Sequence, residues 1–313
     1  MLCITVAQDG SGDFASISEA VLAVPYDCPA QIRIGAGIYR EKLVCEKKDI
    51  ALQGAGADCT RLVWGDGGKL PHPDGRPTHT FRSYTAFFSG ERLRVEDLTI
   101  ENDAGPGAKA GQAVAAYVDS AHAVFEKVRL LGNQDTLFCA PLPEREKDGF
   151  LGPRGLAPRR ASAQYYHDCE IAGDIDFIFG GADALFEQCV LRTVNNGLPH
   201  SWVTAPSGSA EGLGFVFWDC DFVSDSCPQG TVYLGRPWRP TGKTAVLASR
   251  LGAHIAPEGF AGWNDRTDSD LARFAEAGNT GAGACPRGPW VQALDETQAG
   301  ALLCAARRRC CPK

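Results

Sequence analysis

The stretch Phe186–Leu191, with the sequence FEQCVL, is one of five copies of a short phrase in the middle of the chain. The other copies run over residues 95–100 (VEDLTI), 125–130 (FEKVRL), 166–171 (YHDCEI) and 217–222 (FWDCDF). Each copy alternates apolar and polar residues, as a strand with one buried face must. The fourth position holds Leu98, Val128, Cys169, Cys189 and Cys220, at intervals of 30, 41, 20 and 31 residues. We therefore predict that each copy is a short strand with one face against a core.

A constant short strand at irregular intervals is typical of a right-handed parallel β-helix. Each coil returns the chain to the same position, while the loops between strands vary freely in length. We predict an all-β fold of this kind, forming a single domain over residues 1–313. The three Cys of the repeat are then small apolar members of an internal stack, and a metal or redox role is disfavoured.

Helical periodicity is limited to the flanks of this β region. Ile17, Ala20, Val21 and Val24 recur at helical spacing, and Ser16 or Ser18 is a candidate cap. This predicts a short N-terminal helix. A second helix is predicted over Asp268–Ala277, and residues 291–313 are expected to form a helical or irregular tail.

Residues 144–160, with the sequence EREKDGFLGPRGLAPRR, interrupt the repeat. The segment is too long for a tight turn, so we predict an inserted functional loop. Its basic residues either meet substrate carboxylates or are simply solvated, and the sequence favours neither alternative.

The composition excludes several classes of protein. The chain has 313 residues, a formal charge of −7, 44% hydrophobic residues, 36 Gly and 19 Pro. Such a turn-rich chain with an ordinary apolar content is neither a coiled coil nor collagen-like nor disordered. No apolar run is long enough to span a membrane, and the acidic balance argues against nucleic acid as a partner. We expect a monomer.

The cysteines and the N-terminus bear on location. The 13 Cys contain no C-x-x-C pair and no paired spacing of a zinc site, so no metal is predicted. Unpaired thiols fit a reducing compartment. Residues 1–9 lack the basic and apolar regions of a signal peptide. We therefore expect a cytoplasmic protein; the alternative is a secreted protein whose leader is missing from this sequence.

Polar side chains in three segments fall about one coil apart. Gln112 and Gln134 are separated by 22 residues, and Gln134 and Asp176 by 42, which is one coil once a loop of about twenty residues is removed. Asp135 follows Gln134 directly. Because adjacent strands lie about 4.8 Å apart, two amides and two carboxylates are expected on one external face.

That grouping suits acyl transfer. An ionised Asp can attack an ester carbonyl, and a second carboxyl, kept protonated by its neighbour's charge, can protonate the leaving alkoxide. Gln N–H groups can hold the developing oxyanion, and an Arg can keep the nucleophile ionised. Asp, Asn and Gln also cap coils and form ladders in β-helices, so spacing alone leaves a purely structural role open.

Taken together, the motifs resemble those of the pectin methylesterase (pectinesterase) family. They occur in the family's order, over about residues 4–290: DGSGDF at 9–14, GQAV at 111–114, QDTLF at 134–138, DFIFG at 176–180 and LGRPW at 234–238. The resemblance implies a right-handed parallel β-helix that hydrolyses methyl esters of galacturonate. The implied substrate is methyl-esterified homogalacturonan or an oligogalacturonide, with no metal or organic cofactor.

The resemblance also implies roles for individual residues. The catalytic set comprises Asp176 as nucleophile, Asp135 as general acid and then base, Gln112 and Gln134 as oxyanion donors, and Arg236 as the partner of Asp176. Trp238 and Phe179 resemble the aromatic walls that hold the sugar ring. Asn133 and Phe138 stand where the family more often has an aromatic residue and Tyr, so both are expected on the substrate side.

Other functions remain open at this stage. One is a β-helix that binds saccharide without catalysis, and another is a hydrolase of a different carboxylic ester. A lyase or glycosidase on the same architecture is a third. A glycosidase needs two carboxyls beside a glycosidic bond but has no need of the two Gln residues.

Overall fold

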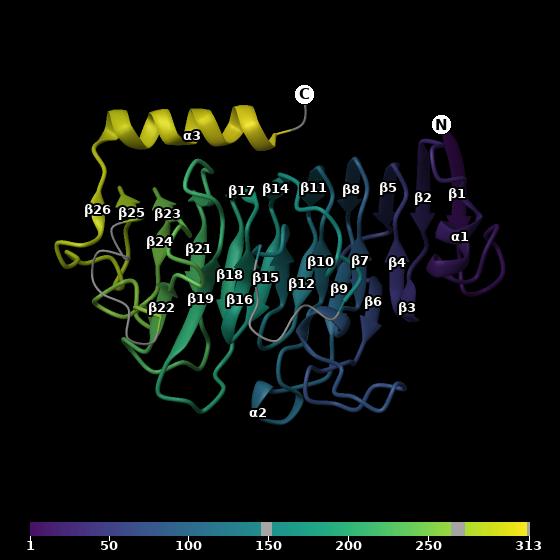
Figure 1. Ribbon diagram of the computed structural model, residues 1–313, viewed down its shortest axis with the longest axis horizontal. Helices are drawn as coiled ribbons and strands as arrows, with labels where there is room; N and C mark the ends of the chain where they lie inside the picture. Colours follow the sequence, from purple (N-terminus) through teal and green to yellow (C-terminus); the bar gives the residue numbers. More distant parts are fainter. Residues whose placement is uncertain (145–151, 264–272, 312–313) are drawn as a thin grey trace.

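The computed structural model describes residues 1–144, 152–263 and 273–311, and it is dominated by three parallel sheets that run the length of the molecule (Figure 1). Sheet A has eleven strands, in spatial order β1 (Leu2–Val6), β2 (Ala30–Ile34), β5 (Asp49–Gly54), β8 (Arg92–Glu96), β11 (His122–Glu126), β14 (Ala163–His167), β17 (Asp183–Glu187), β20 (Phe215–Trp218), β23 (Thr244–Leu247), β25 (Phe274–Ala277) and β26 (Gln292–Ala293). Sheet B has eight: β24 (Arg250–Leu251), β21 (Asp221–Val223), β18 (Val190–Thr193), β15 (Glu170–Gly173), β12 (Arg129–Leu131), β9 (Thr99–Asn102), β6 (Thr60–Trp64) and β3 (Gly37–Arg40). Sheet C has seven: β22 (Val232–Gly235), β19 (Ser201–Pro206), β16 (Ile175–Gly180), β13 (Leu137–Cys139), β10 (Ala116–Val118), β7 (Ala86–Phe88) and β4 (Leu43–Cys45).

From β2 to β24, successive strands along the chain belong to sheets A, B and C in turn, so each complete coil adds one strand to each sheet. β11, β12 and β13 form one coil, for example, and β14, β15 and β16 form the next. The parallel β-helix predicted from the repeat is therefore confirmed.

The prediction that each repeated phrase is a single strand is wrong. Each copy spans the end of a sheet A strand, a corner and the start of a sheet B strand. The corner residue is the third of each copy, and it has a positive φ in all five: Asp97, Lys127, Asp168, Gln188 and Asp219, between 52° and 55°. The second and third positions are both polar in four of the five copies, so the alternation breaks at the corner, and reading each copy as one strand overlooked that break.

The repeat builds the core in layers. The fourth-position residues are all buried, as the predicted stack requires. The first-position rings also stack: Tyr166 lies 4.7 Å from Phe186 and Phe186 lies 4.5 Å from Phe217, with interplanar angles of 8° and 11°. Register pairing in sheet A places these rings directly above one another.

Helices cover the flanks. The predicted N-terminal helix is confirmed as α1 (Ile17–Ala23), whose N-cap Ser16 accepts a hydrogen bond from the Glu19 N–H. The tail contains α3 (Glu296–Cys310), which begins with a capping box of Asp295 and Gln298 and lies across sheet A (Figure 1). Two short turns of helix, η1 (Thr80–Arg82) and α2 (Gly107–Ala110), lie in loops. None of the helices in the described ranges is both long and apolar enough to cross a bilayer.

The prediction of a helix over Asp268–Ala277 is wrong for the part of this range that the structure describes. Its first part lies outside the described residues, and its last four residues form β25. Phe274 and Ala275 pair in register with Thr244 and Ala245 of β23. Strand pairing at the end of sheet A therefore overrides local helix preference.

Candidate active site

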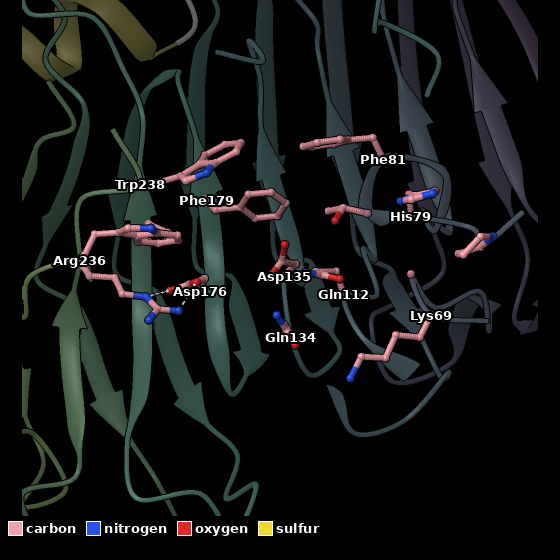
Figure 2. Close-up of a pocket in the computed structure, with 15 residues that line it drawn as sticks. Lys69, His79, Phe81, Gln112, Gln134, Asp135, Asp176, Phe179, Arg236 and Trp238 are labelled. Carbon is pink, nitrogen blue, oxygen red and sulfur yellow. Dashed lines mark hydrogen bonds and ion pairs between the residues drawn. The ribbon is translucent and has the colours of Figure 1, made fainter. Parts of the chain in front are cut away.

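A cavity of about 670 Å³ lies against the outward-facing side of sheet C (Figure 2). Its floor comes from the ends of three neighbouring coils, and its walls come from the loop of residues 68–81 on one side and from aromatic residues on the other. The lining residues are Gly68, Lys69, Pro77, His79, Thr80, Phe81, Gln112, Gln134, Asp135, Asp176, Phe179, Ala205, Arg236, Trp238 and Trp263. All five residues of the predicted catalytic set are therefore together at one cavity.

Asp135 and Asp176 take equivalent places on adjacent coils. Leu137 pairs with Ile178 in the register of β13 and β16, and the Asp135 N–H donates to the Ile175 carbonyl at 3.0 Å. Both aspartates have a positive φ, 64° for Asp135 and 49° for Asp176. These are sparsely populated conformations for residues other than Gly, and such conformations gather at functional sites.

A β-bulge accompanies Asp176. Between β16 and β19 the register passes from Ile175 opposite Trp202 to Ile178 opposite Thr204, so β16 carries one extra residue at this point. Bulges redirect side chains, and they occur often beside active sites. Here the bulge turns the Asp176 carboxylate toward Arg236 and the cavity (Figure 2).

The electrostatic environment differs between the two carboxyl groups, so their pKa values differ. Burial, followed by the charge of Asp176, raises the pKa of Asp135 well above its usual range. Burial also raises the pKa of Asp176, but the hydrogen bonds and charge of Arg236 act in the opposite direction. The arrangement favours an ionised Asp176 beside a protonated Asp135, which is the division of roles that acid–base chemistry needs.

Arg236 is held on two sides while it binds Asp176. Its Nε donates to Oδ1 at 2.8 Å and its Nη2 donates to Oδ2 at 2.7 Å, a bidentate pair. The guanidinium carbon lies 3.8 Å from the centroid of the Trp202 ring and 4.5 Å from that of Trp263. The guanidinium is therefore held by two aromatic rings in addition to the carboxylate.

The two glutamines approach Asp135 from the residues that precede β10 and β13. A Cβ on Gly68 would lie 3.0 Å from Gln112 Oε1, and a Cβ on Gly107 would lie 2.5 Å from Gln134 Oε1. Each amide oxygen thus packs on a glycine backbone. Figure 2 shows the nitrogen of each amide turned toward Asp135, where it can donate to a bound oxyanion.

The predicted substrate-side residues divide into two groups. Trp238 and Phe179 line the cavity, with ring centroids 5.9 Å apart. Phe138 is fully buried below Phe179 and beside Phe81, at 4.8 and 5.0 Å, so it supports the wall without reaching the cavity. Asn133 is not among the described residues that line the cavity, and its carbonyl accepts from the Asp174 N–H.

Sequence reasoning missed the wall formed by residues 68–81. Lys69, His79 and Phe81 line the cavity, but none of them was among the predicted site residues. Backbone hydrogen bonds return this loop to the coil, from the Gly68 N–H to the Gln112 carbonyl at 2.7 Å and from the His79 N–H to the Gly68 carbonyl at 2.9 Å. The loop lies outside the repeat, so no periodic signal marked it.

No set of side chains that could bind a metal ion is evident in the part of the chain that the structure describes. No group of three or more His, Cys, Asp or Glu residues there is arranged to hold an ion. The cavity instead offers two carboxyls, two amides and a guanidinium.

The comparisons with known proteins agree with this site. The sequence model of the pectinesterase family matches residues 3–143 and 159–293. The chain is 33% identical to Pectinesterase 31 of Arabidopsis thaliana over 309 residues, which are 95% of this chain and 89% of that protein. It is also 33% identical to the pectinesterase/pectinesterase inhibitor PPE8B of Prunus persica, covering 89% of this chain and 51% of that one.

Solved structures give the same result. Pectin methylesterase from carrot matches with a TM-score of 0.79 and 30% identity, over 97% of this chain and 95% of that one. PemA from Erwinia chrysanthemi matches with a TM-score of 0.76 and 26% identity, over 96% and 95%. The fold and the site therefore define a carboxylic ester hydrolase built on a parallel β-helix. The chain belongs to the pectinesterase family.

The prediction of a cytoplasmic protein is contradicted by these relatives. Plant pectinesterases and the Erwinia chrysanthemi pectin methylesterase point to a location outside the cell. The prediction took the unpaired thiols as a sign of a reducing compartment. Six of the 13 cysteines are buried in the fold: Cys45, Cys139, Cys169, Cys189, Cys220 and Cys310. A buried Cys acts as a small apolar residue, and its thiol does not report the redox state of the surroundings.

Proposed function

We propose that this chain hydrolyses the methyl esters of galacturonate residues in pectin, with Asp176 as nucleophile and Asp135 as acid and base. The observation that carries the proposal is the placement of the two carboxyls on adjacent coils, with Arg236 bound to Asp176 through a bidentate pair. One carboxyl is thereby held ionised, while the other lies beside it in an environment that favours the neutral form.

In the first step, the Asp176 carboxylate attacks the ester carbonyl carbon and a tetrahedral intermediate forms. The amide N–H groups of Gln112 and Gln134 stabilise its oxyanion. The intermediate collapses with loss of the methoxy group, which takes the proton of Asp135 and leaves as methanol. The products of this step are an acyl-enzyme anhydride on Asp176 and an ionised Asp135.

In the second step, Asp135 accepts a proton from a water molecule, which attacks the anhydride. The same two amides hold the second oxyanion. Asp176 leaves as a carboxylate, so the galacturonate product carries the new carboxyl group. Asp135 ends the cycle protonated, as it began, and Arg236 again stabilises the charge on Asp176.

The saccharide substrate is supported by the cavity itself. Trp238 and Phe179 present apolar ring surface to one side of it, as sugar rings require. A pectin methylesterase with 26% identity and a TM-score of 0.77 has been solved in complex with a hexasaccharide. We propose that methyl-esterified homogalacturonan or its oligomers occupy this cavity, without a metal or organic cofactor.

We further propose that residues 1–313 form one domain that acts as a monomer. One continuous core cluster runs from Ile4 to Val291 and includes residues of all three sheets. One copy of the chain supplies all five proposed catalytic residues at this cavity, so the site does not need a second copy to be complete.

Product analysis tests the reaction class. Methyl-esterified pectin is incubated with the protein, and methanol, new reducing ends and ultraviolet-absorbing unsaturated products are measured together. The proposal predicts methanol alone. New reducing ends would indicate a glycosidase, unsaturated products a lyase, and saccharide binding without any product a binding protein.

A further inference from the structure

Part of this chain has no counterpart in the family match. The family model matches residues up to 143 and again from 159, so residues 144–158 are an insertion relative to it. Residues 145–151 lie outside the described residues, whereas Gly152 and those that follow are described. The basic residues of the loop at 144–160 were expected either to meet substrate carboxylates or to be solvated. Three of them instead bind protein groups: Arg154, Arg159 and Arg160.

The described part of the insertion is anchored to the coil of β10. Arg154 Nε lies 2.5 Å from a carboxylate oxygen of Asp119, the residue that follows β10. Just after the insertion, Arg160 Nη2 donates to the carbonyls of Gly90 and Asp119, at 2.5 and 2.6 Å. The Asp119 side chain is only 5% exposed. A buried carboxylate is costly without a partner, and the charge of Arg154 offsets that cost together with the charges of Arg160 and Arg159, so the pair helps to hold the insertion against this coil.

Beyond this anchor, the insertion touches the wall of the cavity. A Cβ on Gly152 would lie 2.7 Å from both the Cβ and the carbonyl oxygen of Phe81. Only a glycine allows so close an approach of two backbones. Phe81 lines the cavity, and its neighbours include the rings of Phe138, Tyr117 and Phe179, at 5.0, 6.1 and 6.3 Å. Phe81 is thus packed between the insertion and the aromatic layer below the sugar site.

We propose that Gly152 and the Arg154–Asp119 ion pair are positioning residues that fix the Phe81 wall of the cavity and so set how tightly saccharide is bound. None of the three lines the cavity, so they act through Phe81. The proposal rests on the proposed function for its substrate. Because Phe81 is not part of the acid–base machinery, its displacement changes saccharide binding before and during the reaction alike, which raises KM and leaves kcat nearly constant.

Gly152→Ala is the direct test, since the added methyl group must displace Phe81. We expect KM for a methyl-esterified hexagalacturonide to rise at least about fivefold, with kcat within about twofold of the wild type. The Kd of the fully de-esterified hexamer, measured by calorimetry, should rise in parallel. Gly300→Ala in α3 is the matched control, because a Cβ there meets nothing within 4 Å.

A double-mutant cycle tests the route through Phe81. In a Phe81→Ala background the ring is gone from the wall, so Gly152→Ala should change KM by less than about twofold. Arg154→Met should raise KM like Gly152→Ala, and Arg154→Lys, which keeps the positive charge, should restore most of the binding. The Lys variant also covers the case in which Arg154→Met does not fold.

Specific outcomes would overturn the proposal. A folded Gly152→Ala protein with wild-type KM and Kd would do so, as would an equally large effect of Gly152→Ala in the Phe81→Ala background. A fall in kcat at constant KM would place the insertion in the chemistry instead of the wall. If the wild type released no methanol, the proposed function would fail, but the Kd comparison would still test the wall.

Discussion

Asp135 and Asp176 are 41 positions apart in the chain, yet they occupy the same register position on adjacent coils, each with a positive φ. The repeat of the β-helix brings them together, and the bulge in β16 turns Asp176 toward Arg236. Neither aspartate lies in a regular strand conformation, which is consistent with strain that the surrounding coils maintain for function. The reactive geometry is therefore a property of how the coils stack.

The first prediction concerns pH. Asp176 must be ionised and Asp135 must be protonated to begin the reaction, so kcat/KM should fall at low pH through Asp176 and at high pH through Asp135. Asp135→Asn should lower kcat by about 10²–10⁴-fold, and its residual rate should lose the fall at high pH. Asp97→Asn, the same change at a corner residue with positive φ, should leave the profile unchanged. A retained alkaline limb in Asp135→Asn would assign that limb to another group.

The second prediction concerns the rings around Arg236. Trp202→Leu removes the closer ring, so the guanidinium should hold the Asp176 carboxylate less firmly and the pKa of Asp176 should rise. The acid limb of kcat/KM should then move to higher pH, and kcat should fall by about tenfold. Trp202→Phe should restore most of the activity. Tyr233→Leu is the control, because Tyr233 stacks on Trp202 and is not over the guanidinium. An unmoved acid limb would show that Trp202 only supports the fold.

The third prediction concerns the oxyanion. Gln134→Ala removes an amide donor that is proposed to act mainly in the transition state, so kcat should fall by about 10²–10³-fold with little change in KM. Gln112→Ala should behave similarly. Steady-state kinetics of methanol release measure both values. A rise in KM at constant kcat would instead indicate that these amides bind the ground-state substrate.

The fourth prediction concerns the core. Phe186 is stacked between Tyr166 and Phe217, so Phe186→Ala should lower the free energy of unfolding by about 3–5 kcal/mol. Chemical denaturation measures the change. Leu22→Ala, at a side chain that is 80% exposed, should have almost no effect. A loss below about 1 kcal/mol for Phe186→Ala would mean that the stacked rings do not carry the core.

The fold was predictable because a β-helix repeats one local solution. The same buried position recurs in Leu98, Val128 and the three stacked cysteines, and it signals a chain that returns to one place. The corners were missed although the sequence marks them, since two polar residues stand together in four of the five copies where Asp97 and its equivalents turn the backbone. The strand at Phe274–Ala277 was missed because its pairing with β23 lies far away in sequence.

Four of the five proposed catalytic residues could be grouped from the coil spacing, whereas Arg236 and the individual roles were expected only from the resemblance to the pectinesterase family. The walls of the cavity could be predicted only in part: Trp238 and Phe179 were expected there and line it, whereas Phe81 was not expected. Phe138 was expected to face substrate, but Phe81, from a loop outside the repeat, covers it. Trp202 is on a coil, and the pairing of β19 with β22, which lie about thirty residues apart in the chain, brings Arg236 over its ring. Contacts that depend on the path of a loop or on a single inserted residue do not produce a repeat in the sequence, so they could not be predicted from it.

The most direct test of the account is methanol release from methyl-esterified pectin by the wild type and by Asp176→Ala, compared at equal folded concentration. We predict release by the wild type and a fall of at least about 10³-fold in the variant, since a missing nucleophile leaves only binding and the oxyanion donors. A folded Asp176→Ala protein that releases methanol at close to the wild-type rate would contradict the central claim that this carboxylate attacks the ester.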